Sequence, residues 1–357
     1  MEMFNKNGTE YVQGLIDEGV KNGTRTATVT GKWEIASAVI IPSDFTLILD
    51  SCHLCMADDT FDNMFRNEGA GDVATLTAGE GNKNIKILGR GEAILDGGKY
   101  NGLHEKIASR EGRPHMYVNN LLLFINVDNF EVKNIHCRNQ RYWALDFIYC
   151  SNGHISDIDF LCNDTGIDEN GNLYHGLIRK RRNEVVVKNA DGIDLRHGCH
   201  DIVIENITGF TEDDGVALTG LVSKSKFIVF ETKEKPLDIC NVQIKNIKTA
   251  SFCSNVRLLS QGGVPMHDIL VDGVYDMSKD SPHMDIGGYG VRVGDGDTMY
   301  GWRHATEDEM YNITVKNVRS RATDAAIHLG GKMKNLVLEN IEPFDGAQYM
   351  VDMRSED

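Results

Sequence analysis

Three carboxylates lie at two places in the sequence that are one repeat apart, and from there they could act together on one substrate. Asp191 precedes a glycine and an isoleucine; Asp214 follows 23 residues later, beside Asp213, and precedes a glycine and a valine. If one coil takes this many residues, Asp191 and Asp214 lie on neighbouring strands roughly 5 Å apart. Like charges this close cannot all stay ionised, so one pKa should rise. A protonated carboxyl group beside ionised ones suits the cleavage of a glycosidic bond.

A repeat of short strands with the same spacing runs along the chain. Each strand alternates apolar and polar residues and ends in asparagine, aspartate or glycine. These end positions are residues 89, 134, 157, 206, 246, 273, 317 and 340. Most gaps equal one or two units of 22 to 25 residues, and the gap before residue 246 fits one unit plus a loop near residues 224–236.

This repeat predicts an all-β fold, a right-handed single-stranded parallel β-helix. One unit cannot bury its own apolar face, but units stacked about 4.8 Å apart bury a continuous column of isoleucine, valine and leucine. Asparagine at a corner of each coil can hydrogen-bond to the next coil and tolerates the left-handed backbone of a sharp corner. The consensus of leucine-rich repeats is absent, and the hairpin signals of a sandwich are few.

Residues 1–357 are expected to form one domain, because no linker or composition shift divides them. A segment at residues 10–22 has helical spacing of its apolar side chains, at Tyr11, Val12, Leu15, Ile16 and Val20. We therefore expect residues 1–25 to include a short helix that caps the N-terminal end of the coil. Residues 341–357, which include an acidic tail, are expected to cap the other end.

A second strand in each coil is expected to carry the functional side chains. When these strands are aligned, the apolar residues 145, 193, 216, 256, 291 and 327 point inward and their neighbours point outward. The outward column is Asp146, Asp194, Ala217, Arg257, Arg292 and His328. Such a run from acid to base suits a polar ligand, including an anionic one. Alternatively, the acids cap turns or pair with the arginines, and His328 is simply exposed.

Composition restricts the partners and the compartment. The formal net charge of −16 argues against nucleic acid, which is bound by basic patches, and against anionic membrane surfaces. We find no apolar run of about 18 residues that would span a membrane, and no signal peptide. The eight cysteines are scattered, so we expect reduced thiols and a cytoplasmic location. The oligomeric state is not indicated.

We predict no cofactor and no metal. Cys52 and Cys55 form a single CxxC pair without a second pair, which is weak evidence for zinc. The acidic, glycine-rich run at residues 294–297 lacks the spacing of an EF-hand. The expected partner is an oligosaccharide substrate.

Four segments resemble motifs of the polygalacturonase-like glycoside hydrolases, family 28. Residues 189–194 (NADGID) resemble the NTDGxD motif, and residues 212–218 (EDDGVAL) resemble the DDCxA motif that follows it at the matching distance. Residues 141–145 (RYWAL), which include Trp143, resemble the SPxWT segment that borders the sugar subsite, and residues 290–293 (GVRV) resemble the start of the RIK motif.

The resemblance implies inverting hydrolysis of α-glycosidic bonds in pectin. Asp213 would protonate the leaving oxygen, and Asp191 and Asp214 would hold and deprotonate the attacking water. Carboxyl pairs are about 6.5–9.5 Å apart in inverting enzymes and about 5–5.5 Å apart in retaining ones. The strand spacing is nearer the retaining value, but it measures backbones rather than carboxyl groups, so we follow the family mechanism.

Two residues of the family pattern are missing. The histidine of the GHG motif would fall near Ser254, and the lysine of the RIK motif would fall at Gly294. In the family these two residues handle polygalacturonate, and the pattern here is closer to relatives that cleave rhamnogalacturonan. Arg257, on a neighbouring coil, could replace the lost positive charge, because a guanidinium binds carboxylates in a fork.

The leading hypothesis is a glycosidase that acts on pectin-derived oligosaccharides containing galacturonic acid or rhamnogalacturonan. One alternative is a polysaccharide lyase, with Arg257 or Arg292 as the base and acids that bind calcium; it would leave an unsaturated, UV-absorbing sugar end. Another is a non-catalytic carbohydrate-binding protein of the tailspike kind. It would bind without turnover, and binding alone would not require three converging acids.

Overall fold

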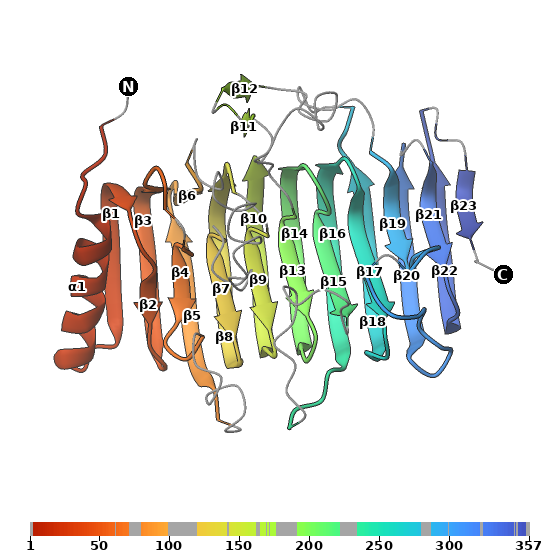
Figure 1. Cartoon of the computed structure of the whole chain (residues 1–357), viewed down its shortest axis with the longest axis horizontal. Coiled ribbons are helices and arrows are strands. Elements are labelled where there is room, and N and C mark those ends of the chain that lie inside the picture. The colour runs from red at the N-terminus through yellow and green to blue at the C-terminus, as the bar shows by residue number, and fades with distance from the viewer. Residues whose placement is uncertain are drawn as a thin grey trace.

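Two parallel sheets run along the length of the molecule and enclose its core (Figure 1). The computed structural model describes residues 3–60, 62–70, 80–98, 120–140, 143–161, 165–168, 170, 172–175, 191–221, 234–279, 287–298, 300–321, 324–345, 347 and 349–354. The chain winds as a right-handed parallel β-helix, as the repeat predicted. Within these ranges, we find no helix that is long and apolar enough to cross a membrane.

Each coil contributes strands to two sheets, which we call sheet A and sheet B. Sheet A has the order β1 (Thr26–Ile35), β3 (Phe45–Met56), β5 (Asn82–Arg90), β8 (Val127–Arg138), β10 (Ser151–Leu161), β14 (His200–Thr211), β16 (Ile239–Ser251), β18 (Met266–Asp276), β20 (Met310–Ser320) and β22 (Lys334–Pro343), with β6 (Ile94–Asp96) paired to β3 and β8. Sheet B has the order β2 (Val39–Ile41), β4 (Phe65–Asn67), β7 (Leu122–Ile125), β9 (Leu145–Ile148), β13 (Ile193–Arg196), β15 (Val216–Leu221), β17 (Ser254–Gln261), β19 (Tyr289–Val293), β21 (Ala325–Gly330) and β23 (Tyr349–Arg354). A separate antiparallel pair consists of β11 (Thr165–Ile167) and β12 (Leu173–His175).

The core is a stack of apolar side chains that repeat from coil to coil. The predicted inward residues of sheet B share one register and are fully buried: Leu145, Ile193, Val216, Val256, Val291 and Ile327. Full burial of one such side chain contributes about 1.5–3 kcal/mol. The predicted inward column is therefore confirmed.

An asparagine ladder closes one corner of the coil, as the sequence predicted. Asn206, Asn246 and Asn317 have φ values of 52–57°. They lie inside β14, β16 and β20, which continue beyond them, so the expectation that each strand ends at this residue is wrong. The Asn246 side-chain amide donates to the Asn206 carbonyl oxygen at 2.7 Å, and Asn340 donates to Asn317 at 2.8 Å. Each side chain thus ties its coil to the one before.

A second ladder, which the sequence analysis missed, precedes the first by five residues. It lies where each strand of sheet A begins, at Asp44, Asn84, Asn129, Asn152, Asp201, Asn241, Asp268, Asn312 and Asn335, all with positive φ. The Asn335 amide donates to Asn312 at 2.9 Å. The signal was available as an asparagine or aspartate directly before the first apolar residue of most of these strands.

The two ends of the coil differ from each other (Figure 1). Helix α1 (Gly8–Lys21) packs on β1 and β2 and buries Val12 and Ile16, which confirms the expected helix. Val20, which we placed on its apolar face, is 37% exposed. At the other end, residues 341–343 complete β22 and β23 follows, so most of the described part of residues 341–357 forms the last coil rather than a cap over it.

Candidate functional site

Asp191 and Asp214 lie on neighbouring coils, immediately before β13 and β15. The register pairs Ile193 with Val216, and the backbone N–H of Asp214 donates to Oδ1 of Asp191 at 2.9 Å. The glycine after each aspartate allows this close stacking, because a Cβ atom at Gly192 would lie only 2.5 Å from the backbone oxygen of the next coil. The predicted stacking of the two acids is therefore confirmed.

Asp213 joins this pair from the same turn as Asp214. Its backbone oxygen accepts hydrogen bonds from the hydroxyl groups of Thr211, at 2.9 Å, and Ser251, at 2.5 Å. These bonds fix the turn and leave the Asp213 side chain half-buried, whereas Asp191 and Asp214 are buried. Asp213 is thus the most accessible of the three acids.

The environment of Asp191 favours a bound proton. Burial raises the pKa of Asp191 well above its usual value, and the charges of Asp194, Asp213 and Asp214 raise it further. The positive charge of Arg257 opposes this shift but does not cancel it. The predicted rise of one carboxyl pKa therefore falls on Asp191.

The outward column of sheet B has the predicted register throughout. Its strands pair Asp146 with Asp194, Asp194 with Ala217, Ala217 with Arg257, Arg257 with Arg292 and Arg292 with His328. With about 4.8 Å per strand, the column extends over about 24 Å. Apart from Arg292, which is partly exposed, these side chains are buried although they point away from the core.

The acidic end of the column is the most deeply buried. Burial raises the pKa of Asp146 to about 7 and the pKa of Asp194 well above its usual value. Arg196, which the sequence analysis missed, lies 3.4 Å from Asp194 and stacks at 4.1 Å over the ring of Trp143. Arg196 follows Asp194 by two residues on the same strand face, and that spacing was the available signal.

The basic end of the column is held by Asp295, which was also missed. Arg257 contacts Asp295 at 2.5 Å and Asp214 at 3.3 Å, and Arg292 contacts the other oxygen of Asp295. Asp295 lies in the acidic run that we considered only as a metal loop. Its role follows from a turn that brings it back over β17 and β19, which no local pattern indicates.

The structure also shows where His328 lies, and where Ser254 lies, the position at which the histidine of the GHG motif would fall. His328 is buried, so the alternative of an exposed histidine is wrong; it lies 3.3 Å from Asp352, and burial lowers its pKa, with a further decrease from the Arg292 charge. Ser254 lies on the coil after Asp214, where its backbone oxygen accepts a hydrogen bond from the backbone N–H of Gly215 at 2.9 Å. Asn189 and Ala190 of the first motif lie outside the described residues.

One group of side chains has the atoms of a metal site. Carboxylate oxygens of Asp213 and Asp214 and the sulfur of Cys253 lie within 4.8 Å of one another. Burial raises the pKa of the Cys253 thiol well above its usual value, and both acids raise it further. Among the described residues the group offers three ligand atoms, one fewer than the four protein ligands of a structural zinc site.

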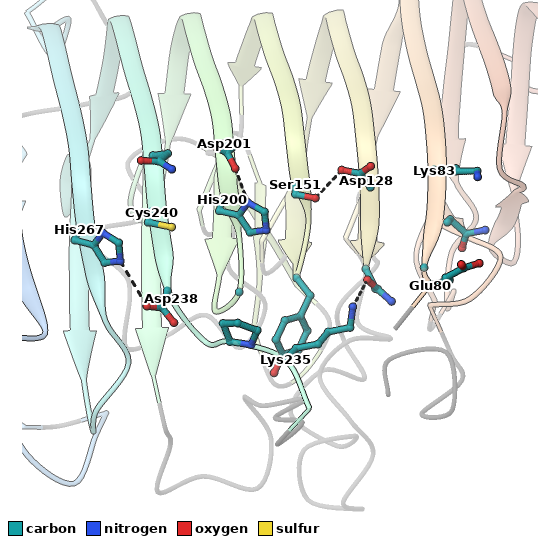
Figure 2. A pocket seen from close by; sticks show the side chains of 17 residues that line it. Glu80, Lys83, Asp128, Ser151, His200, Asp201, Lys235, Asp238, Cys240 and His267 are labelled. Carbon is teal, nitrogen blue, oxygen red and sulfur yellow. Dashed lines mark hydrogen bonds and ion pairs between the residues drawn. The ribbon is translucent and has the colours of Figure 1, made fainter. Parts of the chain in front are cut away.

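A separate groove of about 850 Å³ lies along the outer face of sheet A, near the start of its strands (Figure 2). Several of its charged groups contact neighbours: His267 lies 3.5 Å from Asp238, and Lys235 donates to Asn126 at 2.9 Å. The three acids do not line this groove. The three acids lie instead beside the face of sheet B, before β13 and β15.

Comparisons with known proteins agree with the fold. Residues 41–233, more than half of the chain, match the model for glycosyl hydrolases family 28. The tailspike protein of E. coli bacteriophage HK620, in complex with a pentasaccharide, has a TM-score of 0.56 and 15% identity over 97% of this chain, which spans 61% of the tailspike chain. We find no match among curated protein sequences.

Two solved hydrolases are also similar in fold. An endo-xylogalacturonan hydrolase from Aspergillus tubingensis has a TM-score of 0.49 and 12% identity, with 95% of this chain and 89% of that chain covered. A hyperthermoactive exopolygalacturonase from Thermotoga maritima has a TM-score of 0.43 and 11% identity, with 98% and 88% covered. At these identities the likeness concerns the fold alone.

Proposed function

The chain belongs to glycosyl hydrolases family 28, and on that premise we propose that it hydrolyses α-glycosidic bonds in pectin-derived oligosaccharides. The substrates would contain galacturonic acid or rhamnogalacturonan, and the reaction would proceed with inversion at the anomeric carbon. The observation that supports this most strongly is the convergence of Asp191, Asp213 and Asp214 from two neighbouring coils at the edge of a buried, charged face.

The three acids divide into a proton donor and a water-holding pair. Asp213 is the most accessible, so its carboxyl group protonates the glycosidic oxygen as the bond to the anomeric carbon breaks. Asp191 and Asp214 bind a water on the opposite side of the sugar ring. One of them takes a proton from that water as its oxygen bonds to the anomeric carbon, so one water is consumed for each bond cleaved.

Arg257 supports this division by its contact with Asp214. Arg257 lies 3.3 Å from Asp214, whereas Asp191 lacks such a contact among the described residues and has a raised pKa. Within the water-holding pair, this difference makes Asp214 the carboxylate that takes the proton from the water, while Asp191 orients that water.

The lyase alternative requires Arg257 or Arg292 to act as a base. Both arginines contact carboxylates, and the negative charges of Asp214 and Asp295 keep the pKa of Arg257 well above its usual value. A guanidinium held in this way gives up a proton even less readily than a free one. The geometry therefore favours hydrolysis over elimination.

A product screen tests the proposal. Galacturonan, rhamnogalacturonan and neutral α-linked oligosaccharides are incubated with the protein, and new reducing ends and UV absorbance are measured. We expect reducing ends without an unsaturated product, and a loss of about 10²–10⁴-fold in the Asp213→Asn variant, which is the usual contribution of a general acid. Unchanged turnover in that variant would remove the assigned donor, and binding without turnover would support the non-catalytic alternative.

A further inference from the structure

We propose that Asp295 determines the substrate class of this site, because it supplies an internal carboxylate to the arginines that a substrate carboxylate would otherwise contact. The sugar that lies against Arg257 and Arg292 is therefore a neutral one. This inference rests on the proposed function, and it narrows the substrates to oligosaccharides with an uncharged sugar at this position.

The geometry of Asp295 carries the inference. One carboxylate oxygen contacts Arg257 at 2.5 Å, and the other contacts Arg292. Asp295 is only 3% exposed, so it lies between the arginines rather than in solvent. The second terminal nitrogen of Arg257 contacts Asp214 at 3.3 Å. Both terminal nitrogens of Arg257, which would form a fork on a ligand carboxylate, are thus already engaged by the protein.

Arg292 is engaged in a similar way. Its remaining terminal nitrogen lies 3.6 Å from the sulfur of Cys253, and its ring neighbour is Tyr289, at 5.1 Å from the guanidinium carbon. The side chain therefore faces Asp295 and a thiol. A substrate carboxylate that contacts both terminal nitrogens of Arg292 in a fork would have to displace Asp295, which would deprive this buried carboxylate of one of its two arginine partners.

The position after Val293 offers no other cation. Gly294 has a φ of +74°, and a Cβ atom there would collide with the backbone oxygen of Gly330. A long cationic side chain at this position is therefore excluded by the backbone and by packing. Among the described residues, the ionised carboxylates of Asp214 and Asp295 balance the charges of the two arginines. The arginines therefore provide no net positive charge that would attract a substrate carboxylate.

Two probes that differ only in charge test the inference. A trimer of α-linked galacturonic acid carries carboxylates, and its fully methyl-esterified form is neutral and similar in shape. Binding is measured by calorimetry at low salt in the Asp213→Asn variant, so that turnover does not interfere. We expect the esterified trimer to bind at least about tenfold more tightly, since a carboxylate of the acidic trimer must compete with Asp295 for the arginines and loses its hydration on binding.

A second variant assigns this preference to Asp295. Adding Asp295→Asn should raise the affinity for the acidic trimer by about tenfold or more, because it frees two guanidinium groups for charge-assisted hydrogen bonds. This gain should disappear at high salt. The matched control is Asp272→Asn, which changes the net charge equally but frees Lys316 on the outer face of sheet A. It should leave the preference unchanged.

Each outcome bears on the inference separately from the proposed function. Equal or tighter binding of the acidic trimer by the Asp213→Asn variant overturns the inference, as does a folded Asp295→Asn variant without a gain. If adding Asp295→Asn prevents folding, the preference measured in the Asp213→Asn variant alone decides whether the inference holds. If the preference is found but the wild-type protein cleaves no oligosaccharide, the inference about binding stands and the proposed hydrolysis fails.

Discussion

The outer faces of the two sheets carry charged side chains in the same repeat but hold them in different ways. On sheet A, Lys316 and Asp272 are 3.3 Å apart with about a third of each side chain exposed. On sheet B, Arg257 contacts Asp214 at the same distance, but the side chains are only 10% and 2% exposed. An exposed pair contributes about 0–1 kcal/mol, whereas loss of one partner from a buried pair costs about 3–5 kcal/mol.

This contrast shows what locates the site. The repeat builds both faces with the same strand spacing and the same inward apolar column, so regularity alone does not distinguish them. Buried charge does distinguish the two faces, because a protein retains costly unpaired or competing charges mainly where they serve chemistry. Asp146 and Asp194 illustrate this, since each has a buried carboxylate oxygen without a hydrogen-bond partner among the described residues.

The largest test of the contrast removes one cation from each face. Arg257→Met leaves Asp214 buried without its ion-pair partner and leaves Asp295 with Arg292 alone, so we expect the free energy of unfolding to fall by about 3–5 kcal/mol. Lys316→Met, the matched change on sheet A, should cost about 0–1 kcal/mol. Urea denaturation of both variants measures the difference. Equal losses would show that the two faces do not differ in the way we describe.

A smaller effect should appear in the dependence of stability on pH. The folded state raises the pKa of Asp146 from 3.8 to about 7, so between these values the folded protein holds a proton that the unfolded chain has lost. The free energy of unfolding therefore falls as pH rises through this window, by about 4 kcal/mol at most. Asp146→Asn removes this loss, so the free energy of unfolding of the variant, relative to that of the wild-type protein, should be higher at pH 8 than at pH 5.

The opposite sign is expected on sheet A. Hydrogen bonds from Asn317 and Lys316 lower the pKa of Asp272, so its contribution to stability is present above the unfolded pKa and is lost as pH falls through the folded pKa. Thermal unfolding of Asp272→Asn at pH 3 and pH 6 provides the control. A difference of the same sign in both variants would contradict the assignment.

The smallest expected effect concerns the asparagine ladder, which lies within the strands of sheet A. Asn246 has a φ of 52° and donates to Asn206 at 2.7 Å. Asn246→Gly keeps the left-handed backbone and loses the hydrogen bond, so it should cost about 0.5–1.5 kcal/mol. Asn246→Ala adds backbone strain and should cost about 1–2 kcal/mol more. The denaturation midpoints of the two variants separate the lost hydrogen bond from the backbone strain. Identical midpoints for Asn246→Gly and Asn246→Ala would show that the hydrogen bond, rather than the backbone strain, dominates.

The sequence was most informative where the structure is periodic. A fixed spacing predicted the coil, the inward column from Leu145 to Ile327, and the stacking of Asp191 with Asp214. These features depend on which residue lies one coil away, and a repeat length determines that. The outward column was predicted for the same reason.

The sequence was least informative where a turn or a covering side chain decides the environment. The contacts of Asp295 depend on the path of the turn after β19, and the cover of Asp194 depends on Arg196 stacking over Trp143. Neither of these contacts repeats from coil to coil, so the repeat length does not predict them. The burial of His328 was missed because an outward position in a strand is usually solvated, whereas here Tyr289 and Asp352 cover it.

The hydrogen bond from the Asp214 amide to the Asp191 side chain also has a kinetic consequence. Its donor and acceptor belong to different coils, so the catalytic arrangement exists only while these two coils remain stacked. Contacts in such a fold are local, and one pair of coils can open while distant coils stay closed. Loss of turnover during gradual denaturation will therefore report the opening of this one junction, and hydrogen exchange at the Asp214 amide will measure how often it opens.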